Sequence, residues 1–197
     1  MRDRVFFSYR LIAVCSFAIA AWAAPAAAQT ISGQARVAQV TTFSALGAPT
    51  TTVVGDTGTL ADSSDVRQAS QITASIPDVL TCGTMHAVTI GWSDQVASET
   101  SLSDLALTVA GTTIGADFVM SRAAAVLGAA GGGKVAIEGL SINGLPIAVT
   151  GATNQVVLIP GGRVVINEQQ STTSNALHVV IDGVADVIVG SATAGIQ

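Results

Sequence analysis

The feature that most constrains this chain is a series of short, β-branched segments separated by turn sequences about every ten residues. Apolar and polar residues alternate over residues 36–41, as in a strand with one buried face. Turn residues follow at Gly55-Asp56 and at residues 160–162. A parallel α/β fold would need amphipathic helices, and the closest candidate, residues 118–127, has only its alanines to favour a helix. The sequence therefore predicts an all-β fold, an antiparallel β-sandwich or jelly-roll-like barrel. Other strands are expected at residues 50–54, 87–90, 105–109, 155–159, 163–167, 176–181 and 185–190.

One hairpin is marked by its turn residues. Asn143-Gly144 lies between apolar residues, and this dipeptide suits a type I′ turn, in which both central residues need positive φ. Pro146 follows. Because proline has no N–H to donate, we expect Pro146 either in an edge strand or at the start of the second strand of the hairpin. A second tight reversal is expected at residues 160–162.

Residues 1–28 are typical of a secretory signal peptide. They contain a basic start with Arg2, Arg4 and Arg10, an apolar stretch over residues 11–22, and three alanines before Gln29. About a dozen apolar residues are too few for a spanning helix, which needs about 20. We expect a signal helix, cleavage after Ala28, and one β-rich extracellular domain over residues 29–197.

Two alternatives compete with cleavage at that position. The segment could remain as a membrane anchor, or Cys15 could be lipidated, since it ends the sequence Ile12-Ala13-Val14-Cys15. Val14 is bulkier than the residue that usually precedes a lipidated cysteine, and the apolar stretch continues past it. The expected location is therefore extracellular or in the cell envelope, with the periplasm as an alternative.

The composition of residues 29–197 excludes several classes of partner. Five basic residues stand against twelve acidic ones, a net charge of −7, and the aromatic residues are Phe43, Trp92 and Phe118 alone. Binding to nucleic acid requires clustered cations, and so does binding to an anionic membrane. We therefore expect neither partner, and no stable membrane insertion after signal cleavage. Cys82 is the one cysteine in this range; it is either a buried thiol or a link between subunits.

Neither histidine has an evident catalytic partner. His178 and Asp182 lie on one face of the same expected strand, but four residues at about 3.3 Å each separate them by about 13 Å. General acid–base catalysis needs a partner within hydrogen-bonding distance, and none can be placed beside His86. We predict that both histidines are structural.

Two further segments invite functional interpretations. Asp56, Asp62 and Asp65 could offer oxygen ligands to calcium, but their spacing does not fit an EF-hand loop, and a solvated loop is the preferred interpretation; Asp182 and Asp186 are treated in the same way. Residues 128–135 match a phosphate-binding loop except at Val135, where the motif requires Ser or Thr. We expect a flexible glycine connection there.

Two short segments resemble each other. Residues 102–107 (LSDLAL) and 137–142 (IEGLSI) share the pattern apolar, any residue, small or acidic, Leu, small, apolar. The similarity indicates either a duplicated β unit or chance likeness between two strands.

The second half of the chain resembles the choice-of-anchor P family, a group of exported bacterial domains. The resemblance covers residues 102–196 and rests on GLSINGLPIAVTG at 139–151, Asn154-Gln155, PGGRVVINEQ at 160–169, NALHVV at 175–180 and ADVIVGSA at 185–192. It implies an extracellular or envelope-associated domain and brings no catalytic residues. The last residues, 192–197, show no sorting signal, apolar tail or basic cluster, so we expect release, or retention through other proteins.

These observations favour a non-enzymatic structural or surface- and matrix-associated protein that assembles through its sheet edges. The alternative is an extracellular binding module for a small apolar ligand. An enzyme is disfavoured by the shortage of acid–base residues. No catalytic, cofactor-binding or metal-binding residue is predicted. The expected partners are other copies of the chain or other envelope and matrix proteins.

Overall fold

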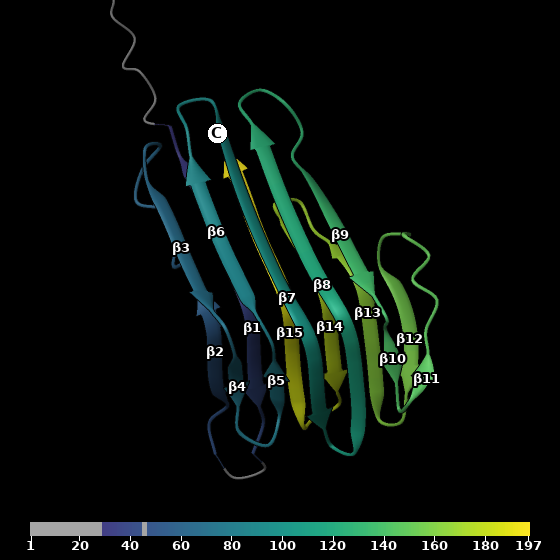
Figure 1. Ribbon diagram of the computed structural model, residues 1–197. Coiled ribbons are helices and arrows are strands. Elements are labelled where there is room, and N and C mark those ends of the chain that lie inside the picture. Colours follow the sequence, from purple (N-terminus) through teal and green to yellow (C-terminus); the bar gives the residue numbers. More distant parts are fainter. Residues whose placement is uncertain (1–28, 45–46) are drawn as a thin grey trace, which may run out of the picture.

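A computed structural model describes residues 29–44 and 47–197. This part of the chain is all β and forms two antiparallel sheets that face each other in a sandwich-like arrangement (Figure 1). The expected signal peptide, residues 1–28, lies outside the described residues. No helix that could cross a membrane is found in the part of the chain described.

The first sheet has six strands in the order β12-β13-β14-β15-β1-β2. Its first and last strands in the sequence, β1 and β15, lie side by side, and β12 and β2 form its edges (Figure 1). The bounds are β1 (Ile31–Thr42), β2 (Thr50–Asp56), β12 (Gln155–Ile159), β13 (Gly162–Gln169), β14 (Thr173–Ile181) and β15 (Ala185–Ile196).

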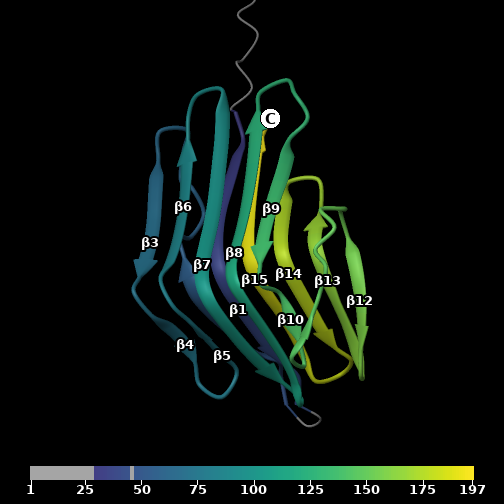
Figure 2. The same cartoon turned by 45° about the vertical axis from the view of Figure 1, so that its right-hand side comes forward.

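The second sheet has nine strands and is built on the hairpin of β7 (Gln95–Val109) and β8 (Thr112–Val126). Each of these strands has two shorter partners in succession along its outer side: β6 and β5 pair with β7, and β9 and β10 pair with β8 (Figure 2). Beyond them, β3 pairs with β6, β4 with β5, and β11 with β10. The bounds are β3 (Val66–Gln71), β4 (Ala74–Ile76), β5 (Leu80–Cys82), β6 (Met85–Gly91), β9 (Gly132–Glu138), β10 (Ser141–Ile142) and β11 (Leu145–Pro146).

Both reversals predicted from turn residues are confirmed. Asn143 and Gly144 have φ of 50° and 76° and join β10 to β11. Pro146 lies in an edge strand, β11, as expected. Pro160 and Gly161 join β12 to β13. The possible helix at residues 118–127 is instead the second half of β8 and the residue after it. Ala123 and Ala125 are buried between the sheets, and Ala124 is exposed on the outer face.

The six-stranded sheet is bent along a transverse row of residues. Asn167, Ala176, Gly190, Val37 and Gly55 lie beside one another on five successive strands, and the pairing skips this row on every strand. Alternate members have positive φ: 54° at Asn167, 67° at Gly190 and 60° at Gly55. A residue with positive φ departs from the extended conformation of a strand and redirects the chain, so this row, here called the first crease, bends the sheet.

The nine-stranded sheet has a second crease of the same kind. Asp104 on β7 and Gly139 after β9 have φ of 50° and 65° and flank Asp117 on β8. These two left-handed residues occupy equivalent positions in the similar segments 102–107 and 137–142. The internal similarity therefore marks the two strands that bend on either side of β8.

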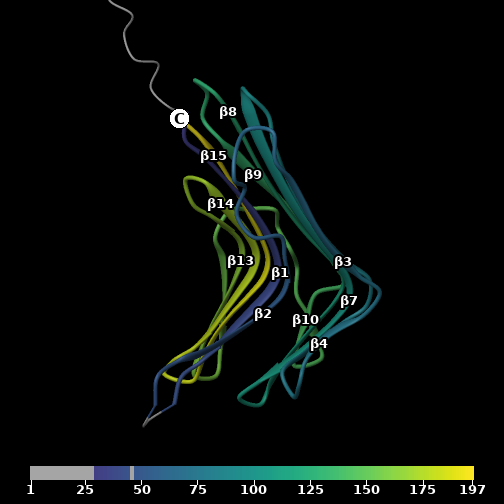
Figure 3. The ribbon, with the colours of Figure 1, turned by 90° about the vertical axis from the view of Figure 1, so that its left-hand side faces the viewer.

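The two sheets bend in the same sense (Figure 3). The six-stranded sheet lies inside the bend of the nine-stranded sheet, so its outer face is concave and the outer face of the nine-stranded sheet is convex. At each crease the side chains that face inward change from one parity to the other on paired strands together, for example from Ala35 and Val37 to Ala38 and Val40 on β1.

The interior differs on the two sides of the creases. Near the C-terminus the sheets approach closely (Figure 3), and the Ser98 hydroxyl donates to the Thr193 carbonyl at 2.6 Å across the gap. Ser121 likewise donates to the Ser174 carbonyl at 2.7 Å. On the other side, large aliphatic side chains fill the space and dominate hydrophobic stabilisation. They include Leu102, Leu105, Leu107, Ile114, Val164, Ile166, Leu177, Val179, Ile181 and Val187.

Candidate functional site

His178 lies between two carboxylates on the concave outer face. Its Nδ1 is 3.0 Å from Oε1 of Glu168 on β13, and its Nε2 is 3.2 Å from both carboxylate oxygens of Asp186 on β15. The His178 and Glu168 side chains are each 18% exposed and that of Asp186 is 34% exposed. The three strands thus carry one linear ionisable cluster, here called the His178 cluster.

The register explains how these residues meet. His178 pairs with Val165 on β13 and Ile188 on β15. Asp186 lies two residues before Ile188 and so shares its face of the sheet. Glu168 lies three residues after Val165 and would face the interior in a regular strand, but the first crease intervenes and returns it to the outer face.

The hydrogen bonds and charges of the cluster favour the ionised forms of His178 and Glu168. Burial would lower the pKa of His178, but hydrogen bonds and charges from Glu168 and Asp186 outweigh it, so the pKa is raised above its ordinary value. Burial would raise the pKa of Glu168, but hydrogen bonds from Asn175 and His178, with the charges of His178 and Arg163, lower it overall. Imidazole can donate to both carboxylates only when it is protonated.

The cluster links neighbouring strands through both nitrogens of the imidazole ring. Both ring nitrogens are engaged, so the ring has no free lone pair with which to act as a base toward a hydroxyl. The two carboxylates lie at opposite nitrogens and do not converge, and no group of three potential metal ligands is found among residues 29–44 and 47–197. The cluster joins β13, β14 and β15 through their side chains.

Asn175 supports the cluster from within the sheet. It is 3% exposed, and its Nδ2 donates to Oε2 of Glu168 at 2.6 Å. Glu168 therefore uses one carboxylate oxygen for His178 and the other for Asn175. The Asn175 Oδ1 is buried and accepts no hydrogen bond from the described residues. An unsatisfied polar atom costs about 1–3 kcal/mol, which opposes the stabilisation that the cluster provides.

The sequence places no carboxylate within hydrogen-bonding distance of His178, but the structure places two there. Asp182 was the candidate partner, on the same expected strand, whereas the observed partners come from the two neighbouring strands. His86 also has a cross-strand partner, because its Nδ1 lies 2.7 Å from the Ser70 hydroxyl on β3. The prediction that neither histidine is catalytic stays a prediction.

The three aspartates considered for calcium bind groups close to them. Asp56 accepts from Arg36 at 3.2 Å, and Asp65 accepts from Arg67 at 2.7 Å. Asp62 accepts from the main-chain N–H two residues later at 2.8 Å. These contacts are those of Asx turns and surface ion pairs, and they direct the three carboxylates to separate partners.

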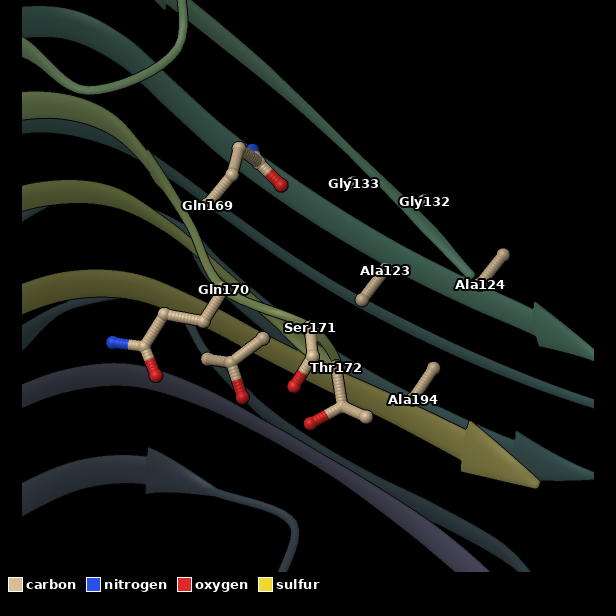
Figure 4. A pocket seen from close by; sticks show the side chains of 10 residues that line it. Ala123, Ala124, Gly132, Gly133, Gln169, Gln170, Ser171, Thr172 and Ala194 are labelled. Carbon is tan, nitrogen blue, oxygen red and sulfur yellow. The ribbon is translucent and has the colours of Figure 1, made fainter. Parts of the chain in front are cut away.

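The glycine-rich segment lines a small cavity instead of a phosphate site. Residues 128–131 connect β8 to β9, and Gly132 and Gly133 begin β9. Figure 4 shows this segment facing the β13–β14 connection, with Gln169 directed toward Gly133. The cavity volume is about 10 Å³, room for about one water molecule. A Cβ at Gly133 would collide with the Gln169 side chain and lie 2.7 Å from the Ser174 Cβ, so close packing requires this glycine.

Cys82 is buried in β5 and forms no disulfide. Burial raises the pKa of its thiol and outweighs the effect of a hydrogen bond with the Ala74 main chain. A buried thiol that stays protonated is a poor nucleophile. The structure therefore favours the buried thiol over a link between subunits.

The edge strands differ in how well they are protected from pairing with other chains. Charges and proline are the usual guards: β3 carries Arg67, β9 carries Lys134, and β11 carries Pro146. The edge strand β12 has the sequence QVVLI, without charge or proline. Its Val156 and Leu158 are 53% and 82% exposed. Of the other edge strands, β2 ends in the charged Asp56, and β4 also lacks charge and proline but has only three residues. β12 is therefore the candidate interaction edge.

Comparison with protein-family models, with curated proteins and with solved structures finds no match. The resemblance of residues 102–196 to choice-of-anchor P domains therefore stays a prediction.

Proposed function

We propose that this chain is an exported, non-enzymatic structural protein of the cell surface or extracellular matrix that assembles through its sheet edges. The observation that supports this proposal is the edge strand β12, which has no charged residue or proline to prevent pairing and which exposes Val156 and Leu158. Exposed sheet edges of this kind are templates for pairing with another chain. The resemblance to an exported bacterial family supports the same proposal.

The other features agree with a structural role. The His178 cluster ties three strands together and leaves no ring nitrogen free for acid–base chemistry. The glycine-rich segment packs against Gln169 and encloses only about 10 Å³. An apolar ligand would need a pocket of about 300 Å³ or more, which this cavity does not provide. Two open depressions on the nine-stranded sheet, of about 540 Å³ beside Val79 and about 340 Å³ beside Ile90, are large enough, so the binding-module alternative remains the second candidate.

Export is tested on the protein made by its own cells. Fractionation should recover it outside the cytoplasm, and intact mass should correspond to a chain that begins at Gln29. A cytoplasmic protein that retains residues 1–28 would contradict export, and a lipid on Cys15 would contradict the cleavage site. Assembly is tested by the mass of the secreted form in solution, where dimers or larger multimers are expected and a uniformly monomeric protein would contradict the proposal.

A further inference from the structure

We propose that β12 is the edge through which assembly occurs, and that its partner is β12 of a second copy, paired antiparallel about a two-fold axis at Val157. This inference rests on the proposed function and specifies its interface. It follows from the hydrogen-bonding pattern of β12, from the side chains it exposes and from the self-complementarity of its sequence.

The β12–β13 hairpin determines which main-chain groups of β12 are free. The turn at Pro160 and Gly161 has two residues, and Ile159 pairs with Gly162 as the closing pair. The closing pair of a two-residue hairpin is hydrogen-bonded, and hydrogen-bonded and non-hydrogen-bonded pairs then alternate along an antiparallel ladder. The N–H and C=O groups of Val156 and Leu158 therefore point away from β13, toward the free edge.

No other described segment takes up these groups. The hydrogen bonds that reach β12 from outside its ladder go to the Gln155 side chain, whose Oε1 accepts from Thr150 N at 2.9 Å and whose Nε2 donates to Ala148 O at 2.8 Å. Within the described part of the chain, the main-chain groups of Val156 and Leu158 have no partner besides those that strand pairing with another chain would supply.

A second β12 matches this edge. With the two-fold axis at Val157, Val156 of one copy faces Leu158 of the other, and the two residues exchange both main-chain hydrogen bonds as a hydrogen-bonded antiparallel pair. The same contact occurs twice by symmetry, as in an isologous interface. The strand is uncharged, so no like charges are brought together.

The side chains of the paired edges also fit. Val156 and Leu158 point to the same outer face because they are two residues apart. Across the proposed axis, Val156 of each copy would contact Leu158 of the other copy. Val156 continues the row of Val165 on the concave face, and Val165 is 8% exposed. Pairing would thus join two six-stranded sheets into one continuous sheet and cover the exposed aliphatic side chains.

Cysteine cross-linking tests the register. Val157 would face its own counterpart as a non-hydrogen-bonded pair with Cα atoms about 4.5 Å apart, within the range that a disulfide spans. Val157→Cys should therefore give a disulfide-linked dimer in high yield under mild oxidation. Thr52→Cys, on the opposite edge strand β2, is the matched control and should stay monomeric, as should the parent chain with its buried Cys82.

Charged substitutions on β12 test whether this edge is required for assembly. The double variant Val156→Lys and Leu158→Lys should abolish assembly, because pairing would bring four lysines together. Ile72→Lys changes a side chain with the same 82% exposure as Leu158 and should assemble like the parent. Suppose that the parent chain assembles, that Val157→Cys fails to cross-link and that the lysine variant still assembles. These results together would overturn this interface but leave the proposed function standing. A parent chain that never assembles would overturn both.

Discussion

Asn167 and Gly190 face Ala176 from opposite sides in the first crease, and both have positive φ, 54° and 67°. The strand between them, β14, crosses the crease without a left-handed residue at Ala176. The bend of the six-stranded sheet is therefore made by residues on alternate strands, and the concave face and the position of Glu168 both depend on it.

Gly190→Ala should be more destabilising than the same change at a turn glycine. A Cβ at Gly190 would lie 3.0 Å from the Ala176 Cβ, in addition to the strain of positive φ. Gly183 has nearly the same φ, 68°, but open space around it, so Gly183→Ala reports strain alone, about 1–2 kcal/mol. Urea unfolding should show a further loss of about 1–3 kcal/mol for Gly190→Ala. Equal losses would show that the crease is not tightly packed.

The His178 cluster should make stability depend on pH in two directions. The raised pKa of His178 means that its contribution is complete below about 6.5, its ordinary value, and is lost as pH rises through the folded-state pKa. The lowered pKa of Glu168 means that its contribution is complete above about 4.5 and is lost as pH falls through the folded-state pKa.

A double-mutant cycle measures this dependence. Glu168→Gln, His178→Gln and the double variant, unfolded in urea at several pH values, should give a coupling energy that is largest between about pH 4.5 and 6.5. The coupling should decline on both sides of that window. A coupling that does not change with pH would mean that the two groups are not paired as ions.

Neither histidine is expected to be needed for function. His86→Gln and His178→Gln should both be secreted, and each should restore whatever surface or matrix phenotype follows deletion of the protein, because glutamine retains a hydrogen-bonding side chain. Circular dichroism establishes that each variant is folded. A folded variant that loses function would instead reopen the interpretation of the protein as an enzyme.

Gly144→Val should lower the free energy of unfolding by about 1 kcal/mol or more, because a β-branched residue strongly disfavours positive φ. A Cβ at Gly144 would meet nothing within 4 Å, so the loss reflects backbone strain alone. Gly144→Asn is the matched control, since asparagine tolerates this conformation, and it should recover most of the stability. A valine variant with unchanged melting temperature would contradict the type I′ turn.

Local patterns in the sequence predicted the strands and two of the reversals well. Residues 36–41, 50–54, 87–90 and 105–109 all lie within strands, because alternation and β-branched residues reflect a half-buried pleated surface. The creases were not predicted, since the change of parity at a crease breaks the alternation of apolar and polar residues and looks like a weak strand. Their signal is a break in the apolar spacing of two, either to three, as between Leu102 and Leu105, or to one, as between Val37 and Ala38.

The His178 cluster was missed because it depends on register between strands. The contact between His178 and Asp186 could have been predicted from the sequence. Asp182-Gly183 is a hairpin turn signal, and a reversal there places Asp186 diagonally beside His178. Glu168 was not accessible from alternation alone, because the crease at Asn167 changes the face on which it lies. Long-range pairing of this kind is set by the whole sheet and not by any local pattern.

Sedimentation velocity on the secreted form, over a wide range of concentration, tests the central claim most directly. The account predicts that the weight-average mass rises with concentration for the parent chain and stays at the monomer value for the variant with lysine at positions 156 and 158. A parent chain that stays monomeric throughout the range would contradict assembly through an exposed sheet edge, and with it the proposed structural role.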